Sequence, residues 1–193
     1  MRITSFLTAI VLTTVTILAG PAEAREMGGV KMPDTIEVSG KQLRLNGMGK
    51  REATVLKVDV YVAGLYVEQP SSDPATLVKS NQTKVLVLRF VRDVERDDIL
   101  KAWRTGFAGN ATVPLATIQP QIDQLNSWMA DFSDGDTLTF TYVPGTGVYV
   151  DVNRTRKGLL KGEDFAGSLF SIWLGPKPPN AALKKGLIGK HEA

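Results

Sequence analysis

Few side chains of this protein could carry covalent or metal chemistry. The chain has no cysteine, and its single histidine, His191, stands close to the C-terminus. Thiol catalysis is therefore excluded, and neither a Ser-His-Asp triad nor a zinc site with the usual cysteine and histidine ligands is expected. No residue pattern points to a cofactor.

Carboxylates offer another kind of site, because Asp131, Asp134 and Asp136 stand close together around Gly135. Oxygen ligands of this type can hold a hard cation such as calcium. However, the ligand series and the closing glutamate of an EF-hand loop are missing. The spacing therefore favours a turn, and we predict no metal site.

A glycine-rich segment, Gly47-Met48-Gly49-Lys50, has the small residues of a phosphate-binding loop. A P-loop has a longer glycine spacing and a serine or threonine after the lysine, where this chain has Arg51. The third glycine of a dinucleotide-binding fingerprint is also missing. The segment therefore predicts a glycine turn that connects two strands.

Polar residues inside predicted strands are further candidates for binding. Arg89 interrupts the apolar run from Lys84 to Val91, and a buried guanidinium needs a partner. We therefore expect Arg89 to face either a cleft or an acid on the helix layer. Tyr61 lies in another strand, where its ring is expected to be half buried.

The overall charge gives no sign of a nucleic-acid partner. The chain has 23 basic and 20 acidic residues, a net charge of +3, and its basic residues are scattered. A nucleic-acid-binding face would need a continuous basic stripe. These charges are typical of solvated surfaces that keep a protein soluble.

The N-terminal residues have the order of a secretory signal peptide. Arg2 precedes an apolar run from Phe6 to Gly20, and the small residues of Ala22-Glu23-Ala24 follow. We predict that residues 1–24 are cleaved and that residues 25–193 form one domain, in the periplasm or outside the cell. The run is shorter than the roughly 20 residues that span a bilayer, so no stable membrane anchor is expected.

The elements that must position any site follow from periodicity and turn residues. Val55 to Tyr66 alternates, so it predicts a strand whose Val58, Val60 and Val62 face the core. The other expected strands are residues 35–38, 42–46, 84–91, 137–143 and 148–152. Helices are expected after Asp73-Pro74, around Ile99–Phe107 and Ile118–Phe132, from Glu163 to Gly175, and from Asn180 to Leu187. This segregated order of strands and helices predicts an α+β domain.

Two segments resemble the chalcone isomerase-like family, in its bacterial branch. One runs from Leu45 to Arg51 and continues at Lys57-Val58-Asp59-Val60-Tyr61-Val62-Ala63-Gly64-Leu65-Tyr66-Val67. The other is Phe165 followed by Ile172-Trp173-Leu174-Gly175-Pro176, then Leu183-Lys184-Lys185 and Leu187-Ile188-Gly189. The resemblance spans about Thr35 to Gly189.

This resemblance implies an open-faced β-sandwich, in which a curved antiparallel sheet with a layer of helices on one face encloses an apolar cleft. Plant members either cyclise chalcones or lack that activity and bind fatty acids in the cleft. Arg51 matches the family arginine that offers its guanidinium to a phenolate or a carboxylate, which it can bind bidentately.

The rest of the family's catalytic set is not matched. The threonine that polarises the substrate ketone falls near Tyr61, and the stretch from Val94 to Ala102 contains no tyrosine or asparagine. The resemblance therefore predicts a non-catalytic protein that binds a fatty acid or a similar small apolar acid. Arg51, Tyr61 and Arg89 are the predicted ligand-binding residues.

Other interpretations stay open. Arg51 could pair with Glu52 or Asp59 at the surface instead of binding a ligand. The protein could be an isomerase or lyase acting on an enone, with Arg51 and Tyr61 as its polar pair. It could also be an envelope protein with a filled cleft, whose surface binds a protein partner.

Overall fold

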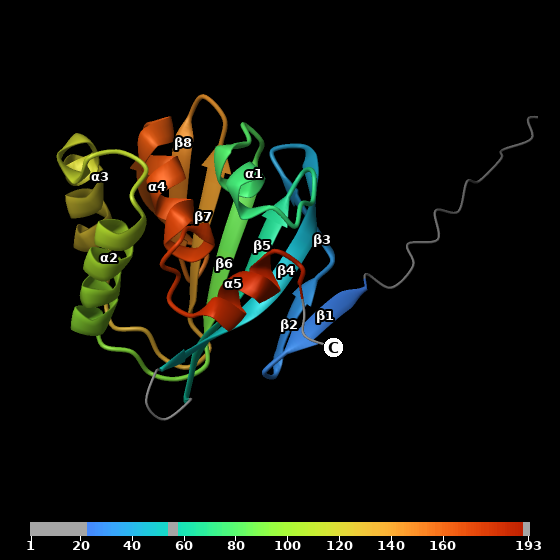
Figure 1. Cartoon of the computed structure of the whole chain (residues 1–193). Coiled ribbons are helices and arrows are strands. Elements are labelled where there is room, and N and C mark those ends of the chain that lie inside the picture. The colour runs from blue at the N-terminus through green and yellow to red at the C-terminus, as the bar shows by residue number, and fades with distance from the viewer. Residues whose placement is uncertain (1–22, 54–57, 191–193) are drawn as a thin grey trace, which may run out of the picture.

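The computed structural model describes residues 23–53 and 58–190 of the chain (Figure 1). Its strands are β1 (Ala24–Met27), β2 (Val30–Pro33), β3 (Thr35–Val38), β4 (Lys41–Ala53), β5 (Val58–Val67), β6 (Lys84–Phe90), β7 (Thr137–Val143), β8 (Gly147–Val152) and β9 (Thr155–Leu160). Its helices are α1 (Pro74–Lys79), α2 (Arg96–Asn110), α3 (Leu115–Ser127), α4 (Glu163–Leu174) and α5 (Ala181–Leu187). The predicted signal peptide lies outside the described residues except for its end, where Ala24 begins β1.

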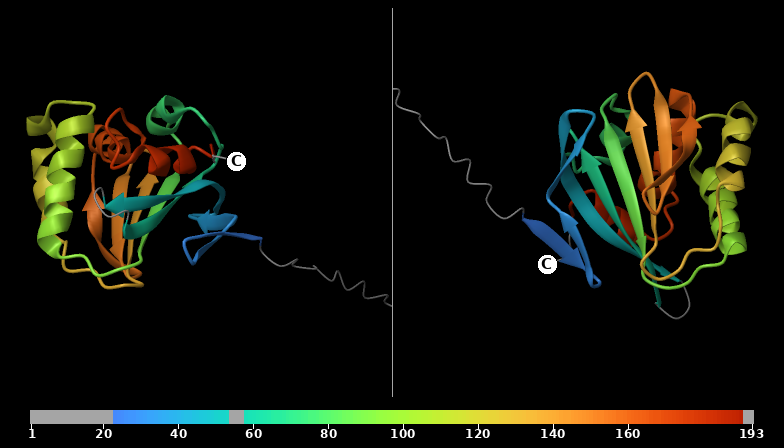
Figure 2. Two further views of the ribbon diagram at one scale, coloured as in Figure 1. Left: turned by 60° about the horizontal axis from the view of Figure 1, so that its bottom comes forward. Right: turned by 180° about the vertical axis from the view of Figure 1, so that it is seen from behind.

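The main sheet has seven strands in the order β3-β4-β5-β6-β7-β8-β9, and every neighbouring pair is antiparallel. The sheet curves around one layer of helices, while β1 and β2 form a separate hairpin on the opposite side (Figure 2). This arrangement confirms the predicted α+β class and the curved antiparallel sheet with helices on one face.

The core occupies the space between the inner face of the sheet and the helices. Large aromatic side chains dominate it, including Phe140 of β7, Trp103 of α2 and Trp173 of α4. A smaller cluster on the outer face packs under the β1–β2 hairpin, where Met32 lies against Gly64. Burial on both faces accounts for the near-continuous apolar character of β5 and β6.

The local signals predicted the ends of α1 and α4 well, whereas the helix expected around Ile118–Phe132 begins at Leu115 and ends at Ser127. Asp73 caps α1 by accepting hydrogen bonds from the backbone N–H groups of Ala75 and Thr76, and Pro74 is the first helical residue. The predicted helix from Glu163 to Gly175 is confirmed as α4. These features depend on neighbours in sequence, which is why they could be predicted.

The face assignment predicted for β5 was wrong. Val62 belongs to the outer cluster and Val58 is 38% exposed, whereas Ala63, Leu65 and Val67 pack into the main core. Both parities of this strand are apolar because both faces are covered over part of its length. The alternation therefore could not identify the face that meets the helices.

The predicted glycine turn was also wrong, because Gly47 and Gly49 lie inside strand β4. A Cβ atom at Gly47 would collide with the carbonyl oxygen of Gly186, and one at Gly49 would collide with the carbonyl oxygen of Leu183. These glycines allow α5 to lie directly on the strand. They serve close packing, not a change of chain direction.

The Glu68 carboxylate should make the free energy of unfolding depend on pH. Its carboxylate accepts hydrogen bonds from Lys41 (2.8 Å) and from the backbone N–H of Thr83 (2.7 Å), and these bonds lower the pKa of Glu68 to about 2. The contribution of Glu68 to the free energy of unfolding is complete above pH 4.5, the usual pKa of a glutamate, and is lost as the pH falls toward 2.

We expect Glu68→Gln to remove about 1 kcal/mol of this acid-dependent stability, allowing for solvent screening. The measurement is urea unfolding of both proteins between pH 5 and about 2. Glu26→Gln is a suitable control, since its carboxylate lies 3.6 Å from an exposed Lys31. If the free energy of unfolding falls equally with pH in the wild type and in Glu68→Gln, the acid dependence does not come from Glu68.

Candidate ligand-binding site at Arg51 and Tyr61

The pairing of β4 with β5 brings two of the predicted site residues together. Arg51 is the direct cross-strand partner of Tyr61, so both side chains lie on the same face of the sheet. That face is the inner one, because Ala63 and Leu65, at alternate positions after Tyr61, belong to the main core. A register shift between Arg51 and Glu52 ends the regular pairing just beyond the site.

Tyr61 is held by the helix layer and by the neighbouring strand. The indole Nε1 of Trp173 on α4 donates a hydrogen bond to the Tyr61 hydroxyl oxygen at 3.0 Å. The ring of Phe90 on β6 meets the tyrosine ring edge-on, with 5.9 Å between ring centroids. Because the hydroxyl oxygen accepts from Trp173, its own proton is available to a further acceptor.

Burial raises the pKa of the Tyr61 hydroxyl to about 12, although the hydrogen bond from Trp173 and the charge of Arg51 oppose this shift. The hydroxyl is therefore protonated at neutral pH. It can donate a hydrogen bond to an anion, but it is poorly suited to act as a general base.

Arg51 has no carboxylate partner in the described part of the chain. Its guanidinium donates to the backbone carbonyl oxygen of Glu52, and its side chain is half-buried. The acids that could have paired with it are bound to Lys50 instead, Asp59 at 3.0 Å and Glu52 at 3.6 Å. The surface ion pair considered for Arg51 is therefore not formed.

Arg89 lies away from this pair. It is exposed on the outer face of β6, while its neighbours Leu88 and Phe90 point into the main core. Its guanidinium lies beside the turn at Gly135. The structure thus brings Arg51 and Tyr61 together on the inner face and leaves Arg89 on the other side, contrary to our expectation that it faces a cleft or the helix layer.

The aspartates near Gly135 build a turn. The carboxylate of Asp131 accepts from the backbone N–H of Arg96 at 2.8 Å, and that of Asp136 accepts from the N–H of Ser133 at 2.8 Å. Gly135 itself has a φ of +92°, a value that favours glycine. Over residues 23–53 and 58–190, no group of three or more acidic or histidine side chains could hold a metal ion.

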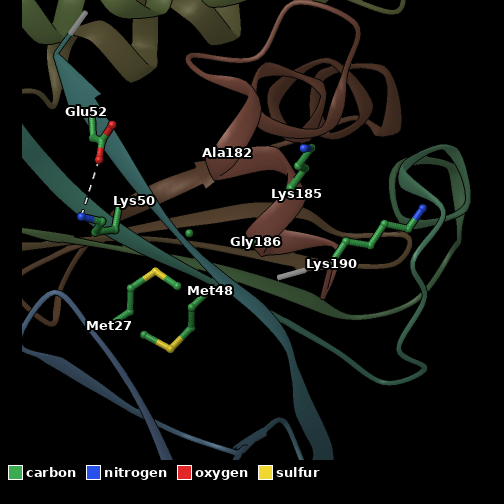
Figure 3. Close-up of a pocket in the computed structure, with 9 residues that line it drawn as sticks. Met27, Met48, Lys50, Glu52, Ala182, Lys185, Gly186 and Lys190 are labelled. Atoms are coloured by element: carbon green, nitrogen blue, oxygen red, sulfur yellow. Dashed lines mark ion pairs between the residues drawn. The ribbon is translucent and has the colours of Figure 1, made fainter. Parts of the chain in front are cut away.

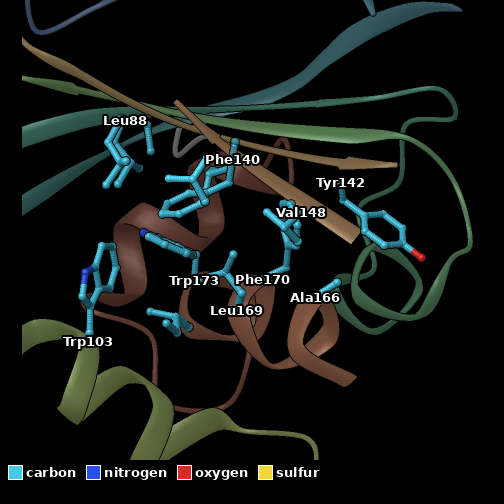
Figure 4. Close-up of a cluster of buried hydrophobic side chains, with 14 of the residues drawn as sticks. Leu88, Trp103, Phe140, Tyr142, Val148, Ala166, Leu169, Phe170 and Trp173 are labelled. Atoms are coloured by element: carbon cyan, nitrogen blue, oxygen red, sulfur yellow. The ribbon is translucent and has the colours of Figure 1, made fainter. Parts of the chain in front are cut away.

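The layer behind the site is closely packed. Phe140, Trp103, Trp173, Leu169 and Phe170 fill the space between the sheet and the helices (Figure 4). The rings of Trp173 and Phe140 lie 5.8 Å apart, centroid to centroid. The apolar cleft implied by the family resemblance is therefore occupied by the protein's own side chains at these positions.

Two hollows of about 160 Å³ each lie outside that layer. One is at the crossing of α5 over β4, where methionine side chains form an apolar floor with lysines around it (Figure 3). The other lies between α2 and α3, with Phe107 and Ile122 at its base and Arg104 at its rim. Both are smaller than the roughly 300 Å³ at which ordinary small-molecule sites begin.

Sequence reasoning missed the residues that hold Tyr61. Trp173 was expected only inside a helix, and Phe90 only inside an apolar strand. Trp173 is 112 positions from Tyr61 along the chain, so no local pattern could link the two. A tryptophan inside an apolar helix face was the available signal, because a buried indole N–H usually needs an acceptor.

Comparisons with known proteins agree on one fold. A family model described as chalcone isomerase-like matches residues 24–189. The structure is similar to the crystal structure of a fatty-acid binding protein from Arabidopsis thaliana, with a TM-score of 0.68 and 16% sequence identity. That match covers 86% of this chain and 96% of the other chain. The comparison with curated proteins gives no match.

Among the described residues, no helix is both long enough and apolar enough to cross a bilayer.

Proposed function

The chain belongs to the chalcone isomerase-like family, and from that premise we propose that it is a non-catalytic protein that binds a fatty acid or a similar small apolar acid. The family resemblance drawn from the two terminal segments is confirmed. The similar Arabidopsis protein is described as a fatty-acid binding protein, which supports an apolar ligand for this fold. The predicted signal peptide leads us to place the binding in the periplasm or outside the cell.

The observation that carries the proposal is the pairing of Arg51 with Tyr61. Within the described residues the Arg51 guanidinium has no carboxylate partner, and it lies on the strand next to the Tyr61 hydroxyl, which is protonated and has an available proton. Both face the apolar core, so a carboxylate bound there would leave its hydrocarbon chain next to apolar side chains. An acid with a short or flexible chain suits this site, because the chain must share space with packed aromatic rings.

Calorimetric titration of the purified protein with dodecanoic acid tests the proposal. We expect Arg51→Gln to weaken acid binding about thirtyfold, because hydrogen bonds to charged groups contribute about 2 kcal/mol each. Binding of dodecanol should change little, since the alcohol has no charge to lose. Arg44→Gln is the control, since Arg44 is exposed on the same strand. An unchanged acid affinity in Arg51→Gln, or no binding by the wild type, would overturn the proposal.

Native mass spectrometry of the exported protein gives a second measurement on the same material. It should show acyl acids that remain bound through purification. The mass of the polypeptide also tests export, because cleavage after Ala24 would leave Arg25 as the first residue. A chain that keeps residues 1–24 would contradict the predicted cleavage.

The filled layer favours a second candidate, an envelope protein that acts through its surface. If the aromatic side chains of the core do not move apart, no acyl chain can enter between the sheet and the helices. Arg51 would then be free to contact an acidic group on a protein partner. The two candidates differ in one result. A surface-binding protein would carry no acyl acid and would show no heat on titration with dodecanoic acid.

A further inference from the structure

Trp103 has a feature that packing alone does not explain. The residue lies on α2 and is 4% exposed, with its ring edge-on to Trp173 at 5.8 Å and to Phe140 at 6.0 Å between centroids. Its indole Nε1 is buried, and no atom of the described chain accepts its hydrogen. Buried tryptophan N–H groups usually have a partner, because an unpaired donor loses its hydration without compensation.

The indole Nε1 of Trp103 is a hydrogen-bond donor, and this determines which kind of partner it needs. Five buried side-chain atoms lack a partner within the described residues, and four of them are oxygen atoms that accept hydrogen bonds. Trp103 supplies the one donor, so the complementary group must be an acceptor. A carbonyl or carboxylate oxygen that comes from outside the chain fits this requirement.

The position of Trp103 connects it to the site already described. Its ring contacts that of Trp173, and the N–H of Trp173 donates to the Tyr61 hydroxyl. Figure 4 shows the nitrogen-bearing edges of both indole rings directed toward the same side of the helix layer. An oxygen atom of a ligand bound by Arg51 and Tyr61 would therefore lie on the side to which the Trp103 N–H points.

We propose that the Trp103 indole N–H is the third hydrogen-bond donor of this site and makes the site selective for ligands with a carboxylate group. This inference rests on the proposed function of binding a small apolar acid. The guanidinium of Arg51 binds the carboxylate, and the Tyr61 hydroxyl and the Trp103 N–H each donate one further hydrogen bond to its oxygens. An alcohol of the same length cannot accept from all three groups, so it binds less tightly.

The variant Trp103→Phe tests this role, because it removes the N–H and keeps an aromatic ring in the core. Dodecanoic acid should bind this variant about tenfold more weakly than it binds the wild type, the loss expected for one hydrogen bond to a charged group. Dodecanol affinity should change less than twofold. Trp128→Phe is the matched control, since Trp128 packs against Gly158 at another position and should leave both affinities unchanged.

Two measurements separate ligand binding from a structural role. The rise in melting temperature caused by dodecanoic acid should be smaller in Trp103→Phe than in the wild type, and this difference excludes the cost of the cavity that the smaller ring leaves in the core. In nitrogen-proton NMR spectra the Trp103 indole signal, assigned by its absence from Trp103→Phe, should shift downfield when dodecanoic acid is added. An equal rise in both proteins, with no shift of the indole signal in the wild type, would overturn the inference.

Failure of this inference can be distinguished from failure of the proposed function. If Arg51→Gln weakens acid binding and Trp103→Phe does not, the site binds acids but Trp103 is not one of its donors. If the wild type binds no acid at all and the indole signal does not move, both conclusions are wrong.

Discussion

Gly186→Ala should lower the free energy of unfolding by about 3 kcal/mol or more, although alanine is normally the better helix residue by about 1 kcal/mol. Gly186 lies in α5, where the helix rests on β4. A Cβ atom there would collide with the carbonyl oxygen of Met48 and would lie 2.9 Å from the Cα of Gly49. Both obstacles are backbone atoms, so no rotamer change can relieve the contact.

The effect would reach the binding site. Gly49 and Arg51 lie on the same face of β4, and Asn180, just before α5, donates a hydrogen bond to the Lys50 carbonyl oxygen at 3.3 Å. A displaced α5 would therefore disturb the strand that positions Arg51. We expect Gly186→Ala to weaken acid binding as well as stability.

Chemical unfolding of Gly186→Ala and Gly109→Ala provides the measurement and its control. Gly109 lies in α2, where an added Cβ would have the flexible side chain of Lys177 as its nearest neighbour, at 3.4 Å. This control should be neutral or slightly stabilising. If the two variants have the same stability, the close contact between α5 and β4 is not required for folding.

Lys84→Met should lower the free energy of unfolding by about 2 kcal/mol. The side chain is only 2% exposed, and its ammonium donates to the carbonyl oxygens of Leu77 (2.7 Å), Val78 (3.1 Å) and Ser80 (3.0 Å) at the end of α1. Methionine fills a similar volume but cannot donate, so these acceptors at the helix end would lose a charged donor.

Two opposing terms decide the sign of this effect. Burial lowers the pKa of the Lys84 amine to about 8, which corresponds to a cost of about 3 kcal/mol for the charged form. Three hydrogen bonds from a charged donor contribute about 1.5 kcal/mol or more each, and so exceed that cost. The rings of Tyr142 and Phe170, with centroids 5.3 Å and 5.6 Å from the ammonium, add a smaller attraction.

Thermal unfolding of Lys84→Met at pH 7 measures the balance. Lys79→Met is the control, because Lys79 is exposed in the last turn of the same helix and should change stability by less than about 0.5 kcal/mol. A Lys84→Met protein more stable than the wild type would mean that the cost of burying the ammonium dominates.

The sequence alone was enough to determine the features that depend on near neighbours. The capped start of α1 at Asp73-Pro74 and the helix from Glu163 each need only a few consecutive residues. The predicted strands and helices, and with them the α+β class, followed from such patterns. The motif around Arg51 also pointed to the correct family.

The tertiary structure decided everything that depends on contacts between distant segments. Pairing in the sheet placed Arg51 beside Tyr61 and left Arg89 on the opposite face. Gly47 and Gly49, predicted as a turn, lie in a strand that α5 packs against. Packing of α2 on α4 leaves the Trp103 N–H without a partner among the described residues. The physical reason is that both faces of the central strands are apolar, so their pattern carries no information about which face meets which partner, and only the assembled layers make that choice.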